Sequence, residues 1–238
     1  MTTILAREIA LRPGGTKGSD NRPDRRLLKG YLHKTSNTLC GIKGYASLIA
    51  DRENDSGEAG QWARKIILEV ERMEDIFRSV GDLTRGRGHP DAGVDLSLFV
   101  EETASAFATQ HDELDLGIEA IPPGELKLPV ADLVLILKEI LKNCAESVGQ
   151  SSRNVKVEIS GVLLPGGRVF LEIRDNGRGM EPELLGQASS PFITTKEGHH
   201  GVGLTRVDTL MDMYGLAWSL ESEEEQGTRV LLEVAETV

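Results

Sequence analysis

The chain has 238 residues and is short of several residue types, each of which a particular class of protein would need. It has two cysteines, Cys40 and Cys144, and their wide separation fits neither a disulfide framework nor a metal-binding spacing. Both lie in helix-like stretches, where a small buried side chain is the simpler role for cysteine. Aromatic residues make up 4% of the chain, but a hydrophobic content of 39% is enough for a core in one large or two small domains.

Basic residues are also scarce, with 27 Lys and Arg against 38 Asp and Glu, which gives a formal net charge of −11. Nucleic-acid binding is therefore not expected, because no basic stripe is available to neutralise phosphates. No apolar run approaches the length of a membrane span, and the N-terminus lacks the apolar region of a secretory signal. We therefore predict no membrane insertion and a cytoplasmic location.

Composition divides the chain into four parts. A flexible leader is predicted for residues 1–26, because residues 12–26 are rich in Arg, Gly, Pro and Asp. Residues 27–84 have helical periodicity, and residues 85–93 are rich in Gly and Pro and are predicted to be a hinge. Residues 94–238 mix helix-like and strand-like patterns and form the second predicted domain.

Apolar residues in the second part repeat with alternating spacings of three and four, which indicates two helices with heptad seams. The first seam comprises Leu28, Leu32, Thr35, Leu39, Ile42, Ala46 and Ile49, and the second comprises Ala63, Ile66, Val70, Met73, Phe77, Val80 and Thr84. The polar stretch 51–60 separates them, so we expect an antiparallel hairpin. One hairpin alone buries too little apolar surface to be stable. We therefore predict a homodimer in which two hairpins form a four-helix bundle.

One histidine of the first helix lies next to its seam. His33 follows the seam residue Leu32 and should face solvent at the edge of the bundle. Asn37 is four residues further on and shares that face. An exposed histidine on a charged helix usually has no function, so a role for His33 depends on the rest of the chain.

The second domain is predicted to be an α/β sandwich with helices on one face of a mixed sheet, so the fold class of the chain is α+β. The pattern predicts helices over 96–108, 131–148 and 205–214, and strands over 116–121, 154–164, 168–174, 217–221 and 228–234.

Two glycine-rich turns in this domain suit a nucleotide. The first, Asp175-Asn-Gly-Arg-Gly-Met180, follows a predicted strand, and its Asp can accept a hydrogen bond from an exocyclic amine. The second, Gly201-Val-Gly-Leu204, begins a predicted helix, where backbone N–H groups and the helix N-terminus favour phosphate. Glu139 and Asn143 are four apart on another predicted helix, and such a pair suits Mg²⁺ and the ordering of a nucleophile near a γ-phosphate.

Together these motifs resemble those of the sensor histidine kinases, in the ATPase superfamily that also holds gyrase, Hsp90 and MutL. The N, first glycine, phenylalanine, second glycine and third glycine boxes are matched by Glu139-x-x-x-Asn143, Asp175-Asn-Gly-Arg-Gly-Met180, Pro191-Phe-Ile-Thr-Thr-Lys196, Gly201-Val-Gly-Leu204 and Gly227-Thr228. Five boxes in the right order are specific, whereas a lone Gly-x-Gly is not. The resemblance covers about residues 94–235 and implies the Bergerat α/β sandwich, with ATP and Mg²⁺ bound.

The predicted hairpin extends the resemblance. His33-Lys-Thr-Ser-Asn-Thr-Leu39 is similar to the phosphoacceptor box of the family's dimerisation and histidine-phosphotransfer domain. His33 would then attack the γ-phosphorus of ATP. The usual Glu or Asp after the histidine is replaced by Lys34, which removes the obvious general base. One group of these kinases does carry a basic residue there, in a His-Arg-x-x-Asn pattern.

The resemblance also implies the site residues. ATP contacts are implied for Asn143, Asp175, Gly177, Gly179, Phe192, Lys196, Gly201, Gly203, Leu204 and Thr228, with Gly227 beside Thr228 on the adenine side. Asn143 would hold Mg²⁺, and Glu139 would support a water of the metal. Phe192 and Lys196 would belong to a mobile lid. The first glycine of the usual lid motif is absent, and His199 and His200 stand there.

Three functions remain open at this level. The first is an ATP-dependent protein-histidine kinase that autophosphorylates His33 and transfers the phosphoryl group to an Asp of a response-regulator receiver domain. The second is an ATP-binding phosphatase or phosphorelay partner with weak or absent autokinase activity, in which Asn37 orients water. The third is a non-catalytic ATP-gated scaffold. The leader is too short for a sensory domain, so a separate sensory partner is expected.

Overall fold

The computed structural model divides the chain into two compact units. The described parts of one unit lie within 25–84 and 189–206, and those of the other within 87–188 and 207–237. The structure describes residues 25–52, 57–84, 87–112, 114–147, 155–190, 193–194 and 201–237. The predicted leader therefore lies almost entirely outside the described residues.

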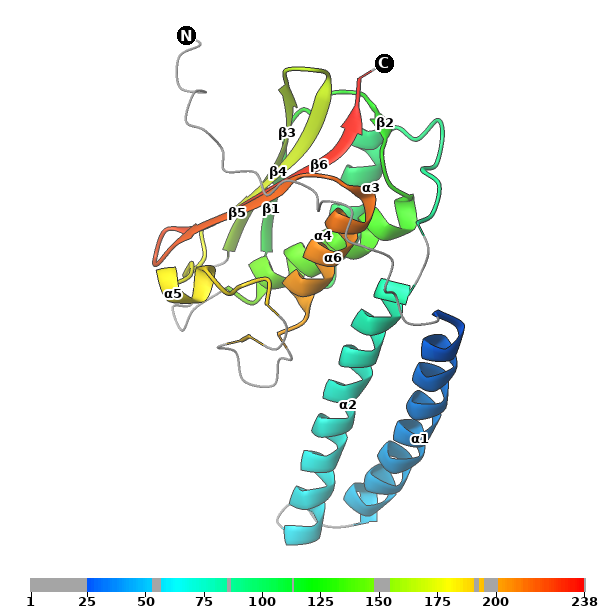
Figure 1. The fold of residues 1–238 in the computed structure, drawn as a ribbon. Coiled ribbons are helices and arrows are strands. Elements are labelled where there is room, and N and C mark those ends of the chain that lie inside the picture. Colours follow the sequence, from blue (N-terminus) through cyan, green and yellow to red (C-terminus); the bar gives the residue numbers. More distant parts are fainter. Residues whose placement is uncertain are drawn as a thin grey trace. The chain divides into compact units, whose positions relative to one another are not determined.

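The first unit contains a pair of antiparallel helices, α1 (Arg25–Arg52) and α2 (Glu58–Thr84), which lie side by side (Figure 1). Lys43 of α1 reaches across to α2, where its Nζ lies 3.0 Å from Glu71 Oε1 and 3.5 Å from Glu74 Oε2. The glutamate hydrogen bonds and charges raise the pKa of Lys43, outweighing the opposite effect of burial. These contacts fix the register of the hairpin.

Heptad positions of the hairpin differ in burial. Leu39, Ala46, Ala63 and Val70 are buried between the helices. The intervening seam positions remain open to solvent, with exposures of 44% at Ile42, 45% at Ile49, 42% at Ile66 and 42% at Met73. One hairpin thus covers only part of the apolar surface that its heptads present.

The second unit is built on a six-stranded mixed sheet. Its strands are β1 (Leu114–Ile118), β2 (Glu125–Leu126), β3 (Val155–Leu164), β4 (Arg168–Asp175), β5 (Trp218–Glu223) and β6 (Gly227–Glu236). The order is β1-β3-β4-β6-β2, and β5 also pairs with β6. Only β1 and β3 are parallel among these pairs. The helices are α3 (Leu96–Ala108), α4 (Val130–Ala145), α5 (Pro182–Leu185) and α6 (Gly203–Tyr214), and residues 203–206 of α6 belong to the other unit.

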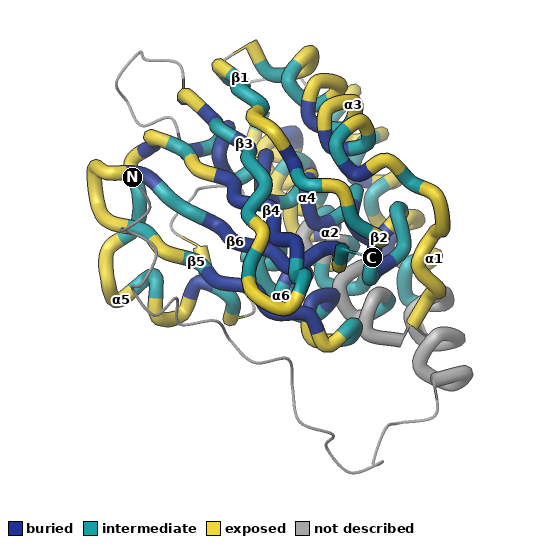
Figure 2. The backbone as a smooth tube through the Cα atoms, turned by 90° about the horizontal axis from the view of Figure 1, so that it is seen from above, coloured by how far each residue is buried: buried dark blue, intermediate teal, exposed yellow. Residues whose placement is uncertain are grey.

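Strand periodicity explains how this unit forms its core. Alternate residues of β3, β4 and β6 point to one face, where α3, α4 and α6 pack against them. These inward residues are Val155, Val157, Ile159, Val169, Leu171, Ile173, Val230, Leu232 and Val234. Buried positions accordingly line the middle of the sheet and the facing helices (Figure 2). The predicted α+β class with a mixed sheet and helices is confirmed.

Local interactions set the helix ends. Asp95 caps α3, because its Oδ1 accepts the Leu98 N–H at 3.1 Å. α4 ends at Ala145, three residues before the predicted end, because the Ser147 hydroxyl donates to the Cys144 carbonyl at 2.7 Å in the following turn. Sequence patterns did not predict the two-residue β2 or the one-turn α5. No helix among the described residues is long and apolar enough to cross a membrane.

Candidate nucleotide-binding site

The expected adenine-reading carboxylate, Asp175, is the last residue of β4. Its Oδ1 accepts the Gly177 N–H at 2.9 Å, and the Ser147 hydroxyl lies 3.4 Å from the same oxygen. Burial raises the pKa of Asp175, and the N–H groups of Gly177 and Thr228 and the side chains of Cys144 and Ser147 oppose that shift only in part. Asp175 is thus a fixed, partly desolvated acceptor.

The turn after Asp175 packs tightly against the end of α4. A Cβ on Gly177 would lie 1.9 Å from Ser147 Oγ, so no larger residue fits there. The Arg178 N–H donates to the Ser147 carbonyl at 3.1 Å, which ties the turn to the chain leaving α4. The C-terminal end of α4 and the Asp175 turn therefore form one structure.

The other side of the turn approaches the β5–β6 hairpin. Gly179 has φ +66°, and a Cβ there would lie 1.9 Å from the Glu223 carbonyl oxygen. Thr228 pairs with Asp175 in the β4–β6 register. Its hydroxyl lies 2.9 Å from the Ser222 hydroxyl, which also donates to the Gly227 carbonyl at 2.9 Å. Asp175, Gly177, Gly179, Gly227 and Thr228 are thus brought together.

Glu139 and Asn143 lie on α4 one helical turn apart, and both side chains are partly buried. The Asn143 Nδ2 is buried and has no hydrogen-bond partner among the described residues. An amide group left in this state carries a free-energy penalty of about 1–3 kcal/mol, which a bound phosphate or a hydrated cation would relieve. Rotation of the amide can turn either its oxygen or its nitrogen toward such a ligand.

The donor set suits a hydrated Mg²⁺ better than a fully protein-coordinated metal. No group of three or more His, Cys, Asp or Glu residues that could hold a metal ion is present in the described part of the chain. Mg²⁺ commonly uses one or two protein oxygens together with substrate phosphates and water. Glu139 and Asn143 would supply protein oxygens of that kind.

Three expected phosphate-site residues belong to the unit that contains the hairpin. Gly201 has φ +63°, and a Cβ there would lie 2.6 Å from the Ile193 carbonyl oxygen. Gly203 is the first residue of α6, and Leu204 follows it with a partly buried side chain. The other lid residues of the prediction, Phe192, Lys196, His199 and His200, lie outside the described residues.

The expected phosphoacceptor, His33, lies within α1, as does Lys34, and their side chains are outside the described set. The hairpin register places residue 33 by its backbone. Because the two helices are antiparallel, the residue ten positions before Lys43 lies opposite the residues ten positions after Glu71 and Glu74, which are residues 81–84. Residue 33 is therefore level with the last turn of α2. Asn37, one turn further along α1, is exposed.

Sequence reasoning missed two hydroxyl groups of the site, those of Ser147 and Ser222. Ser147 lies four residues after Asn143, so both share one face of the predicted helix 131–148, and this signal was available in the sequence. Ser222 gave no such signal, because its contact with Thr228 depends on the pairing of β5 with β6.

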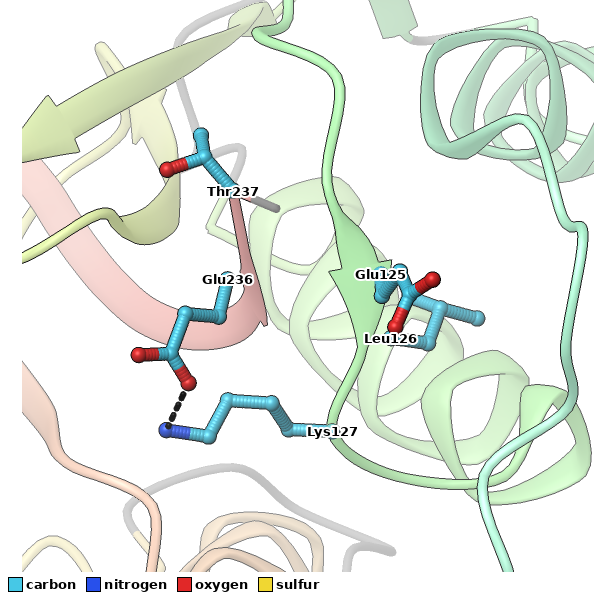
Figure 3. A pocket seen from close by; sticks show the side chains of 5 residues that line it. All are labelled: Glu125, Leu126, Lys127, Glu236 and Thr237. Atoms are coloured by element: carbon cyan, nitrogen blue, oxygen red, sulfur yellow. Dashed lines mark ion pairs between the residues drawn. The ribbon is translucent and has the colours of Figure 1, made fainter.

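A shallow pocket occurs at the opposite end of β6, lined by Glu125, Leu126, Lys127, Glu236 and Thr237 (Figure 3). In it Lys127 Nζ lies 3.7 Å from Glu236 Oε2. Eight residues separate Glu236 from Thr228, which corresponds to about 26 Å of strand. This pocket is therefore remote from the Asp175 turn and does not contribute to the nucleotide site.

The sheet, its helices and the glycine-bounded Asp175 turn define an ATPase domain. Residues 130–238 match the family model of the histidine kinase-, DNA gyrase B-, and HSP90-like ATPases. This match covers a little under half of the chain, and over most of its length the chain is similar to sensor histidine kinases.

Curated relatives support the similarity to sensor histidine kinases. The sensor histidine kinase ZraS of Salmonella typhi is 25% identical over 205 residues, which are 84% of this chain and 43% of ZraS. Sporulation kinase B of Bacillus subtilis (strain 168) is 22% identical over 233 residues, which are 97% of this chain and 54% of that kinase. The chain spans about half the length of the curated relatives it matches.

A solved structure supports the fold. The crystal structure of full-length ShkA in complex with AMPPNP superposes with a TM-score of 0.68 at 19% identity. The match covers 91% of this chain and 47% of ShkA. At this identity the likeness shows a common fold.

Proposed function

We propose that this chain is an ATP-dependent protein-histidine kinase of a two-component system. It autophosphorylates His33 and passes the phosphoryl group to an aspartate of a response-regulator receiver domain. The observation that carries the proposal is the Asp175 turn, where a buried carboxylate is held by the Gly177 N–H in a domain of an ATPase family. The same chain carries His33 on α1 of a helical hairpin.

The site residues divide the recognition of ATP between them. Asp175 accepts from the adenine amine, and Thr228 with Gly227 lines the adenine side. Asn143 would hold Mg²⁺, and Glu139 would support a water of the metal. Bound Mg²⁺ would supply charge neutralisation between the β- and γ-phosphates. Phosphate contacts are assigned to the lid residues Phe192 and Lys196 and to Gly201, Gly203 and Leu204 at the start of α6.

The transfer itself depends mainly on positioning. Neutral His33, with its proton on Nδ1, presents the lone pair of Nε2 in line with the γ-phosphorus. A P–N bond forms as the bond from the γ-phosphorus to the β,γ-bridging oxygen breaks, and ADP leaves. The receiver carboxylate then attacks the same phosphorus and releases His33.

The exposed seam positions support a homodimer. Two hairpins would cover Ile42, Ile49, Ile66 and Met73 in a four-helix bundle. In this arrangement residues 1–26 are a leader, 27–84 dimerise and accept phosphate, 85–93 link, and 94–238 bind ATP. ATP as phosphoryl donor favours a cytoplasmic site of action.

Labelling with γ-³²P-ATP and Mg²⁺ tests the proposal. Wild type should acquire acid-labile, alkali-stable label, His33→Ala should acquire none, and the matched control His89→Ala should label like wild type. An unlabelled wild type, or a His33→Ala protein that labels normally, contradicts the kinase function. ATP binding without any label would favour the ATP-gated scaffold instead.

A second candidate is a phosphatase or phosphorelay partner, and the Lys34 and Asn37 positions favour it. No carboxylate follows His33 to accept a proton, and Asn37 is exposed one helical turn away, where it could orient water toward a phosphorylated receiver. The test supplies a pre-phosphorylated receiver domain. If Asn37→Ala abolishes dephosphorylation, and Lys34→Glu creates autophosphorylation that wild type lacks, the second function replaces the first.

A further inference from the structure

Part of the predicted hinge is fastened to the ATPase domain. The Gly88 N–H donates to Tyr214 Oη at 3.1 Å, and the Tyr214 hydroxyl donates to Asp132 Oδ2 at 2.6 Å. Three residues further along, Asp91 Oδ2 accepts the Val130 N–H at 2.8 Å and so caps α4, whose own N-cap residue makes no side-chain bond. The linker is therefore held at two points.

The Tyr214 hydroxyl has a defined role in this chain of hydrogen bonds. Asp132 is 5% exposed, and its carboxylate can only accept, so the tyrosine proton must be directed toward it. The tyrosine oxygen is then left to accept from Gly88. A Cβ on Gly88 would lie 2.6 Å from Pro129 Cγ, which shows how closely the linker approaches the start of α4.

Tyr214 also ends α6, the helix whose first residue is Gly203. One rigid element of 12 residues, or about 18 Å, therefore connects the expected phosphate site with the linker. We propose that Tyr214 and Asp132 form a latch on the linker and are positioning residues for phosphoryl transfer. The latch rests on the hydrogen bonds alone, and its effect on transfer rests on the proposed kinase function.

The latch shortens the tether between hairpin and catalytic domain. α2 ends at Thr84, and four Cα steps to Gly88 reach at most about 14 Å. With the latch open, the first fixed residue is Asp91, and seven steps reach at most about 25 Å. The accessible volume then rises about sixfold, so the local concentration of the ATP site falls by that factor. Since residue 33 is level with the end of α2, the short tether keeps ATP near its target.

Tyr214→Phe in the full chain tests the latch, with Tyr45→Phe as the matched control. Removing one hydrogen bond of about 1 kcal/mol should increase hydrogen exchange at the Gly88 amide about fivefold, whereas exchange within β4 stays unchanged. Asp132→Asn retains an acceptor and should preserve protection, but Asp132→Leu should lose it. Melting temperatures show whether a variant such as Asp132→Leu fails to fold. In that case, exchange at the Gly88 amide in Asp132→Asn tests the latch. Unchanged exchange at Gly88 in Tyr214→Phe overturns the latch.

The positioning role has its own readout. Tyr214→Phe should bind ATP with wild-type affinity, yet label His33 about sixfold more slowly in a single turnover. Normal labelling despite an open linker overturns positioning and leaves the latch standing. If wild type itself does not label, the kinase proposal fails, and hydrogen exchange still decides the latch.

Discussion

Burial raises the pKa of the Asp175 carboxylate, and the hydrogen bonds that it accepts lower it. The effect of burial is the larger, so the pKa is raised. A group whose folded-state pKa is raised stabilises the fold at low pH, and that contribution is lost as pH rises through the folded pKa. Ionised Asp175 is therefore a net burden on stability at neutral pH. This penalty supports the proposed role of Asp175 in ligand recognition.

Asp175→Asn should weaken ATP binding at least tenfold, because a charge-assisted hydrogen bond of about 1.5–3 kcal/mol is lost. The melting temperature should stay the same or rise, since the buried charge is removed. Calorimetric titration with ATP and thermal unfolding measure the two effects. Asp115→Asn at an exposed position of β1 is the control and should change neither. Wild-type ATP affinity in Asp175→Asn would contradict the assigned role.

Gly179→Ala should destabilise the ATPase domain by about 2–4 kcal/mol and abolish ATP binding. The alanine would have to adopt a positive φ, and its Cβ would collide with the Glu223 carbonyl oxygen. The positive φ alone costs about 1–3 kcal/mol. Gly166→Ala separates the two terms, because Gly166 has φ +84° but no atom near its Cβ position. Urea unfolding should show a smaller loss for Gly166→Ala, with ATP binding intact. Equal losses would show that crowding at Gly179 is unimportant.

At the scale of elements, one buried carboxylate joins several strands of the sheet. Glu233 of β6 is paired with Lys127 after β2 at 2.8 Å and with Arg168 of β4, and it accepts the Ala217 N–H before β5 at 3.1 Å. Burial alone would raise the pKa of Glu233, but these bonds outweigh it and lower the pKa to about 2. The side chain thus secures the sheet end that lies far from the nucleotide site.

Glu233→Gln should change the acid stability of the ATPase domain. The folded pKa lies below the ordinary value of 4.5, so the stabilisation is present above pH 4.5 and is lost as pH falls toward 2. In wild type the full effect is about 3 kcal/mol, of which roughly 2 kcal/mol is lost between pH 7 and pH 3, and the Gln variant should lack that pH-dependent part. Urea unfolding between pH 3 and 7 measures it, with exposed Glu125→Gln as control. Parallel curves for wild type and Glu233→Gln would refute the assignment.

Sequence periodicity predicted the long elements, because β4 alternates inward and outward along Arg168–Asp175 and helix α3 keeps one apolar face. The Asp175 turn was also predictable, since its glycines are required locally. The end of α4 was not, because Ser147 leaves the helix to meet the Asp175 turn, and that contact requires the folded sheet. The Asp91 cap on Val130 spans 39 residues and has no local signal.

For the whole molecule, the exposed seam predicts the oligomeric state. Ile42→Glu should convert a dimer to a monomer, because it would bury an unpaired carboxylate in the bundle. Sedimentation at increasing concentration measures this change, and Gln61→Glu at an exposed position of α2 should remain dimeric. Wild-type protein that stays monomeric at every concentration would rule out the four-helix bundle.

The half-covered hairpin has a consequence for how copies meet in the cell. If each hairpin completes its core only on a second copy, hairpin folding and association are a single equilibrium, and a tenfold rise in protein concentration strengthens the pair by about 1.4 kcal/mol. Exchange of subunits then requires the hairpins to come apart and lose structure. Pairs formed during synthesis would then persist, which would limit mixing with other chains that carry a similar hairpin.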